Sequence, residues 1–215
     1  MSKKNKNVKK RVTFSDDTTI SSHPTHKKKD SNYDRPPVYV RKTITTVPFH
    51  LLGLIYYYVK VSESYETLKL LLTLIPMQIA YLAFQFNRCT IYGNKRLKVN
   101  IPLLLITAGG SVLLSVPATI IIILFGAPFV EHIFQTWLLA LHASFLAYPA
   151  LYSVFNCDFK VGLWKKYFIA IMIGGWLSCV VIPLDWDRDW QVWPIPVVVG
   201  TYLGAFVGYS TVAYI

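Results

Sequence analysis

The sequence has 215 residues, of which 53% are hydrophobic and only 15% are charged, and it carries a formal net charge of +11. An ordinary soluble domain has about 25% charged residues, so this composition indicates a membrane protein. It excludes a disordered chain and a coiled-coil rod, and three cysteines are too few for a disulfide-stapled secreted module.

Residues 1–42 form a polar segment with 12 Lys or Arg and four Asp. Ser, Thr and Pro lie between its lysine clusters, and it has almost no apolar periodicity. We expect a disordered, basic cytosolic tail without a cleaved leader, because the first apolar run begins only after Lys42. We interpret it as an arm attracted to anionic membrane lipids. It has no folded nucleic-acid-reading module, so nucleic acid is not an expected partner.

Residues 43–215 form the second predicted domain, an all-α polytopic membrane domain. A helix of roughly 20 apolar residues crosses a hydrocarbon core of about 30 Å, and we predict six such transmembrane helices. They are Thr43–Val59, Leu70–Asn87, Val99–Val130, His132–Cys157, Tyr167–Leu184 and Trp190–Ile215. The third and fourth runs almost touch, and Gly126, Ala127 and Pro128 predict a turn between them, at roughly 126–133.

The basic residues alternate between the two flanks of these predicted helices. Nineteen Lys or Arg lie on the side that includes the tail, and only Lys60, Lys69 and Arg188 lie on the other, together with six acidic residues. Because cytoplasmic flanks carry the excess of Lys and Arg, this pattern predicts six spans with both termini cytosolic.

No Asp, Glu, Lys or Arg lies in the middle of a predicted span. Charged groups cost free energy in a bilayer and are usually functional there, so their absence argues against proton relays, ion-coupled transport and intramembrane proteolysis. The predicted spans also contain no polar face that could line the pore of a channel. Interhelical hydrogen bonds explain the polar exceptions, which are His50, Gln78, Gln85, Gln135 and His142. We expect no catalytic residue, metal or cofactor, because the short loops cannot hold the pocket that hydrolysis or phosphoryl transfer requires.

The densest cluster of polar and aromatic residues is the loop from Pro183 to Pro194. Between these prolines it carries Asp185, Trp186, Asp187, Arg188, Asp189, Trp190 and Trp193. In an extended loop the three Asp side chains would project to one face, where they could hold a divalent cation or a cationic head group between aromatic walls. Tryptophan is also enriched at membrane–water interfaces, and we favour that interpretation.

Three glycines of the last predicted span, Gly200, Gly204 and Gly208, follow one another at four-residue spacing. Such a stripe lets a second helix approach closely. That helix is either the fifth span, where Gly174 and Gly175 offer a matching small surface, or a helix of another protein. The sequence leaves both alternatives open.

The block from Ile182 to Pro196, IPLDWDRDWQVWPIP, together with Leu124-Phe-Gly-Ala-Pro128 and Glu131, resembles the phosphatidylinositol-glycan class F family. Two further stretches, DRPPVYVRK from Asp34 to Lys42 and NCDFKVGLWKKY from Asn156 to Tyr167, resemble its fungal members, the glycosylphosphatidylinositol (GPI) biosynthesis protein eleven group. The fungal likeness covers nearly the whole chain.

The resemblance implies a multi-pass protein of the endoplasmic reticulum membrane that has no catalytic residues of its own. Its partners would be the large ethanolamine phosphate transferases, which move phosphoethanolamine from phosphatidylethanolamine to mannoses of the GPI-anchor precursor. We expect the Pro183–Pro194 loop, the turn at Gly126–Pro128 and the glycine stripe to dock a transferase. In the alternative, the same loop binds the GPI precursor, phosphatidylethanolamine or a metal ion beside the partner's active site.

Overall fold

The computed structural model describes residues 38–40, 44–62, 64–92, 95–96, 98–156 and 162–212. The chain divides into residues 1–35 and 36–215, and the description below concerns the second part. The predicted disordered tail therefore lies outside the described residues, with the exception of 38–40.

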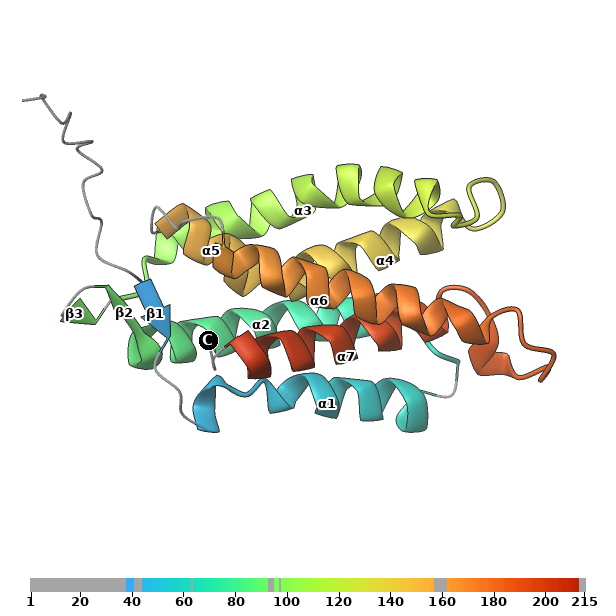
Figure 1. The fold of residues 1–215 in the computed structure, drawn as a ribbon, viewed down its shortest axis with the longest axis horizontal. Coiled ribbons are helices and arrows are strands. Elements are labelled where there is room, and N and C mark those ends of the chain that lie inside the picture. The colour runs from blue at the N-terminus through green and yellow to red at the C-terminus, as the bar shows by residue number, and fades with distance from the viewer. Residues whose placement is uncertain are drawn as a thin grey trace, which may run out of the picture. The chain divides into compact units, whose positions relative to one another are not determined.

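The described part is mostly helical, and each of the six predicted runs contains a helix (Figure 1). The α-helices are α1 (Phe49–Tyr56), α2 (Thr67–Cys89), α3 (Ile101–Leu124), α4 (Ile133–Leu146), α5 (Tyr148–Asn156), α6 (Gly162–Ser178) and α7 (Ile195–Val212). A π-helical turn, Tyr57–Val61, extends α1. Short 3-10 helices comprise Ile44–Thr46, Cys179–Val181 and Asp189–Gln191. The last predicted run began too early, because residues 190–194 belong to the preceding loop.

A small antiparallel sheet adds to the predicted all-α fold. Its strands β1 (Val38–Val40), β2 (Thr90–Tyr92) and β3 (Lys95–Arg96) are ordered β1-β2-β3. In the first pair, Tyr39 lies opposite Ile91. The β-branched and aromatic residues of β2 favour a strand, and pairing with it satisfies backbone groups of β1. Those three residues therefore differ from the disordered tail that we expected.

By length and composition, α2 and α3 can each cross a membrane, and α4 with α5 form a third candidate if this bent pair is one span. Two apolar helices, Phe49–Val61 and Ile195–Thr211, are shorter. In the described part of the chain, this criterion gives two or three spans rather than the six predicted.

The bend of 51° between α4 and α5 has a local cause. Pro149 lacks an N–H, so it cannot donate to the carbonyl of Phe145, four residues earlier. Side chains of other helices take over: Gln78 Nε2 donates to the carbonyl oxygens of Phe145 and Leu146, each at 3.3 Å. The Tyr209 hydroxyl donates to the carbonyl of Leu146 at 2.6 Å. The bend is therefore held by α2 and α7.

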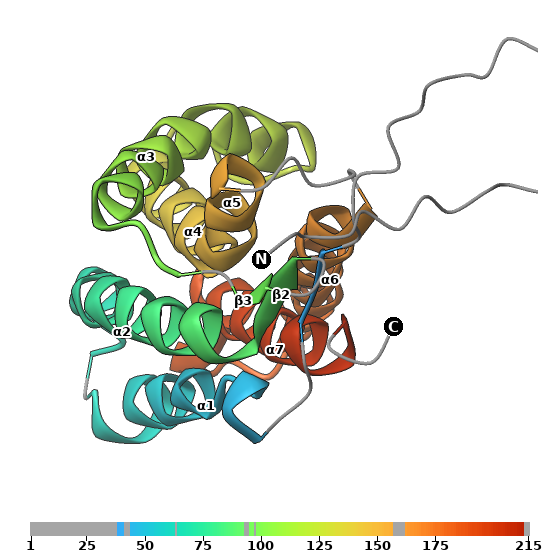
Figure 2. The same ribbon diagram turned by 90° about the vertical axis from the view of Figure 1, so that its left-hand side faces the viewer.

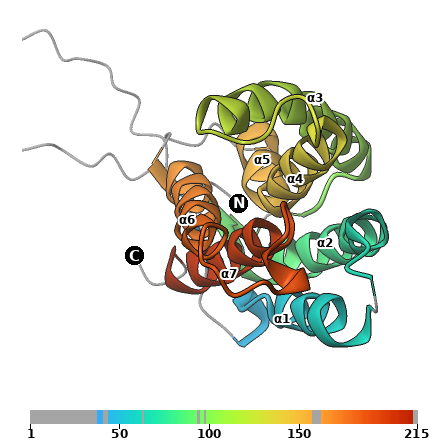
Figure 3. The same cartoon turned by 90° about the vertical axis from the view of Figure 1, so that its right-hand side faces the viewer.

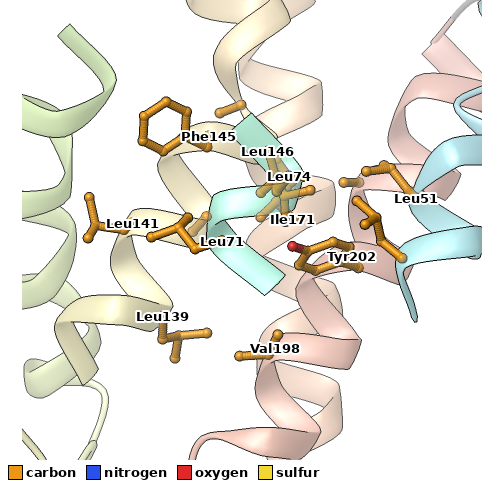
Figure 4. Packing of buried hydrophobic residues seen from close by; sticks show 14 of the residues in the cluster. Leu51, Leu71, Leu74, Leu139, Leu141, Phe145, Leu146, Ile171, Val198 and Tyr202 are labelled. Atoms are coloured by element: carbon orange, nitrogen blue, oxygen red, sulfur yellow. The ribbon is translucent and has the colours of Figure 1, made fainter. Parts of the chain in front are cut away.

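The core of the bundle forms around α4, in which every residue from Leu138 onward is buried. Seen along the helices, α4 lies between α3 on one side and α2 and α7 on the other (Figures 2 and 3). Figure 4 shows side chains from α1, α2, α4, α6 and α7 that meet in this core, among them Leu51, Leu74, Ile171 and Tyr202.

Candidate functional site

The predicted turn between the third and fourth runs is confirmed. Helix α3 ends at Leu124, and α4 begins at Ile133. Gly126 has a φ of +101°, which a residue without a Cβ adopts readily. The amides of Gly126 and Ala127 donate to carbonyls of the last turn of α3 at 2.9 and 3.2 Å.

The loop from Pro183 to Pro194 does not adopt the extended conformation that would align its carboxylates. Asp187 has a φ of +46°, and Asp189 begins a 3-10 turn. Asp185, Asp187 and Asp189 are exposed, and among the described residues no three His, Cys, Asp or Glu side chains lie close enough to hold a metal ion. The rings of Trp186 and Trp190 lie 6.0 Å apart.

Gln191 organises this loop. Its side chain is 7% exposed, and its Nε2 donates to the carbonyls of Val181 and Leu184, each at 2.8 Å. Its Oε1 accepts a hydrogen bond from the backbone N–H of Arg188 at 3.0 Å. Sequence reasoning missed this residue, because a lone amide between two tryptophans gives no signal of which carbonyls it will bind.

Thr136, at the start of α4, joins the loop to the turn. Trp193 Nε1 donates to Thr136 Oγ1, and this hydroxyl donates to the carbonyl of Pro128, both at 3.2 Å. The end of the loop and the turn thus share one fully buried threonine.

A cavity of about 600 Å³ lies between the turn, the loop and helices α4, α6 and α7. Its lining includes five of the residues predicted to dock a partner, which are Gly126, Ala127, Pro128, Pro183 and Trp193. The structure therefore brings two of the predicted groups together. The charged residues of the loop and the three stripe glycines are not part of this lining.

The glycine stripe faces α6 of the same chain, and α6 and α7 are the most extensively packed pair of helices. A Cβ at Gly204 would overlap the carbonyl oxygen of Ala170, and a Cβ at Gly200 would overlap that of Gly174. At Gly208 a Cβ would lie 2.8 Å from the Cβ of Ala170. Of the two alternatives, packing within the chain is the one found here, so the stripe offers no open groove to another protein.

Comparisons with known proteins match residues 46–213 to the GPI biosynthesis protein family Pig-F. The chain belongs to this family. It is 64% identical over 211 residues to "Glycosylphosphatidylinositol anchor biosynthesis protein 11" of Saccharomyces cerevisiae, covering 98% of this chain and 96% of that protein. The proteins of the same name from Candida glabrata and Kluyveromyces lactis are 62% and 56% identical, over 96% and 99% of this chain and 95% and 99% of theirs. No solved structure matches.

Interhelical hydrogen bonds were predicted for five polar residues of this Pig-F family member, and three of them, His50, Gln78 and His142, form such bonds. His50 Nε2 lies 2.9 Å from Gln78 Oε1. His142 is fully buried, with Nε2 3.1 Å from the carbonyl of Thr67 and Nδ1 3.0 Å from the hydroxyl of Tyr202. A carbonyl only accepts, so Nε2 donates and Nδ1 accepts from the tyrosine. These groups join α1 to α2, and α4 to α2 and α7.

The two ends of the Pig-F bundle, which Figure 1 shows at the left and the right, differ in charge. At the end that carries the sheet, the described side chains include no acidic one; the basic ones there are Arg88, Lys98, Lys165 and Lys166. The opposite end holds the Pro183–Pro194 loop, the α3–α4 turn and the start of α2. There Glu66 pairs with Lys69, and the hydrogen bond with this ammonium lowers the pKa of the Glu66 carboxyl.

Proposed function

We propose that this Pig-F family member is a non-catalytic subunit that stabilises the ethanolamine phosphate transferases of GPI-anchor biosynthesis. The observation that carries the proposal is its 64% identity, over nearly its full length, to a protein named for GPI-anchor biosynthesis. We further propose that the chain lies in the endoplasmic reticulum membrane, crosses it six times and keeps both termini in the cytosol. The charge separation between the two bundle ends supports this orientation.

The contacts of His50 and His142 support a stabilising rather than a catalytic role. Both ring nitrogens of His142 are engaged by Thr67 and Tyr202, and His50 is paired with Gln78. A general acid or base needs a nitrogen within reach of its substrate. In these two residues the contacts instead tie helices together.

The docking surface in this proposal is the end of the bundle that carries the turn and the loop. Phe129 and Val130 of the turn are 63% and 82% exposed, and Trp186 of the loop is 55% exposed. Exposed aromatic and aliphatic side chains beside charged ones are typical of protein interfaces. Since α6 fills the glycine stripe, we no longer include Gly200, Gly204 and Gly208 in this surface.

Purification of the tagged chain in mild detergent, followed by mass spectrometry, tests the proposal. We expect a large ethanolamine phosphate transferase to accompany the protein, and Trp186→Ala to reduce its recovery. Phe84→Ala is the control, because Phe84 is a 46% exposed aromatic residue of α2 that lies beside Arg88, at the end of the bundle that carries the sheet. Recovery of no transferase, together with unchanged transferase levels in cells that lack the chain, would contradict the proposal.

The loop carboxylates distinguish docking from direct participation in the reaction. In a second candidate function, the loop binds a lipid head group beside the partner's active site, and its net negative charge favours an ammonium group. Replacing Asp185, Asp187 and Asp189 together with Asn separates the two. A lost complex supports docking, whereas a preserved complex that no longer transfers phosphoethanolamine supports participation.

Protease protection tests the orientation. In sealed microsomes, external protease should remove an epitope placed before Lys42 and leave an epitope inserted after Asp187 intact until detergent is added. Protection of the first epitope would overturn the proposed topology.

A further inference from the structure

The cavity of about 600 Å³ has the size of a ligand site, since such pockets measure roughly 300–1,000 Å³. Its depth comes from small residues of three elements, among them Ala127 of the turn, Ala143 of α4 and Gly175 of α6. Two further lining residues, Ile173 and Trp176, are 49% and 65% exposed, so the cavity opens along the outer side of α6.

Most polar side chains that line the cavity already have hydrogen-bond partners within the protein, so they do not require a polar ligand. Thr201 Oγ1 donates to the carbonyl of Val198 at 2.7 Å, and Cys179 Sγ donates to the carbonyl of Gly175 at 3.4 Å. Trp193 Nε1 is bound to Thr136. The remaining side-chain donor is the indole of Trp176, on the exposed ring at the opening. Among the residues that the structure describes, no charged side chain lines the cavity, so a sugar, a phosphate or a metal ion would lose its hydration without compensation.

The cavity lies beside helices that are predicted to cross the membrane, and this position indicates which molecules can reach it. Ile122 belongs to α3, which is long and apolar enough to cross a membrane, and Met172 belongs to the fifth predicted span. If α3 and the fifth predicted span cross the membrane, the side of the cavity that opens along α6 faces hydrocarbon, and an empty space there would forfeit the dispersion contacts of its walls. An apolar molecule from the bilayer therefore fits this cavity best.

The size of the cavity favours an acyl chain over a helix of another protein as the bound group. A helix with its side chains is about 10–12 Å wide and rises about 5.4 Å per turn, so this cavity would hold roughly one helical turn. A transmembrane partner helix would offer several turns, most of which would find no matching recess. A flexible hydrocarbon chain can follow the cavity over its whole length.

The charges beside the cavity indicate the kind of head group. Pro183 and Trp193 line it, and the chain between them carries Asp185, Asp187 and Asp189 against a single Arg188, all exposed. This net negative charge repels an anionic head group and favours a terminal ammonium.

We propose that the cavity binds one acyl chain of a phospholipid whose head group carries an ammonium group. The bound lipid would fill the space between the turn and α6, with its head group at the level of the acidic loop. This inference requires only that the chain lies in a membrane, and it does not depend on the proposed transferase partner.

Native mass spectrometry of the full-length protein tests the proposal. The protein is delipidated in mild detergent and incubated with palmitoyl-oleoyl phosphatidylcholine, phosphatidylethanolamine or phosphatidylglycerol. We expect one retained molecule of either ammonium lipid, and retention of the anionic phosphatidylglycerol about tenfold lower. Failure of the protein to retain any lipid would overturn the proposal, and equal retention of all three would overturn its head-group part.

Two variants fill the cavity from opposite walls. Cys179→Phe and Ala127→Phe should each reduce lipid retention about tenfold. Val180→Phe is the matched control for the first, because Val180 is 62% exposed and does not line the cavity, and Ala80→Phe, on the exposed side of α2, is the control for the second. Unchanged retention in filling variants that melt at the wild-type temperature would contradict the proposal.

A measurement on the wild-type protein needs no variant. A phosphatidylcholine with a photoreactive diazirine near the end of one acyl chain, added at one molecule per protein, should label Met172 and its neighbours on α6. Labelling spread evenly over outward-facing residues such as Leu113 and Val116 of α3, or a cavity occupied by a segment of a co-purified protein, would overturn the assignment.

Discussion

Trp193 donates its indole N–H to Oγ1 of Thr136 across 3.2 Å. The hydroxyl of Thr136 in turn donates to the carbonyl of Pro128, also at 3.2 Å. One buried threonine therefore links two segments, the α3–α4 turn and the end of the α6–α7 loop, that are more than 50 residues apart in the sequence. Through this link the turn and the loop form one surface and line one cavity.

Thr136→Val keeps the shape of the side chain and removes both hydrogen bonds. A buried donor left without a partner destabilises a protein by about 1–3 kcal/mol, so we expect a lower free energy of unfolding by this amount, measured by thermal or denaturant unfolding in detergent. Thr211→Val is the control, because Thr211 is exposed and its hydroxyl bonds only within α7. Equal effects of the two substitutions would show that the link contributes nothing.

Gly204→Ala should destabilise the chain itself. The new Cβ would overlap the carbonyl oxygen of Ala170 and force α6 and α7 apart, and overpacking of this kind typically costs about 1–3 kcal/mol. Gly53→Ala adds the same methyl group to α1, where nothing lies within 4 Å, so it should leave the melting temperature unchanged or raise it. A wild-type melting temperature for Gly204→Ala would contradict the α6–α7 packing.

Sequence reasoning predicted features that depend on local chemistry. Gly126, Ala127 and Pro128 indicated a turn because their backbone preferences hold in any surroundings. Isolated amides and imidazoles in apolar runs indicated interhelical bonds, since lipid offers them no partner, and His50, Gln78 and His142 form such bonds.

Features that depend on which segments meet could not be predicted. The glycine stripe fits any close helix, and only the placement of α6 beside it resolves the alternatives. The loop carboxylates would align in an extended chain, but the loop folds back, and Gln191 holds it through the carbonyls of Val181 and Leu184 and the N–H of Arg188. Pro149 is the local cause of the bend between α4 and α5, but the donors to the Leu146 carbonyl, Gln78 and Tyr209, are distant in the sequence.

Gln191→Ala should loosen the loop without unfolding the bundle. It leaves the carbonyls of Val181 and Leu184 without their side-chain donor. We expect the free energy of local opening to fall by about 1–3 kcal/mol, which corresponds to roughly 5- to 150-fold faster amide exchange. Hydrogen exchange of the backbone amides in residues 183–192 measures this change. Val192→Ala, at a neighbouring side chain that is 55% exposed, should leave exchange unchanged. Wild-type protection in Gln191→Ala would contradict the role assigned to the amide.

Gln78→Leu and Tyr209→Phe test the bend between α4 and α5. Each removes one of the two side-chain donors to the carbonyl of Leu146, and Gln78→Leu also removes the partner of His50. We expect each variant to lower the free energy of unfolding by about 1–3 kcal/mol. The double variant should lose more than the sum, because only then does the buried Leu146 carbonyl lack both donors. Met77→Leu, at a partly exposed neighbour on α2, is the control. Strict additivity in the unfolding free energies would show that the two side chains do not share this carbonyl.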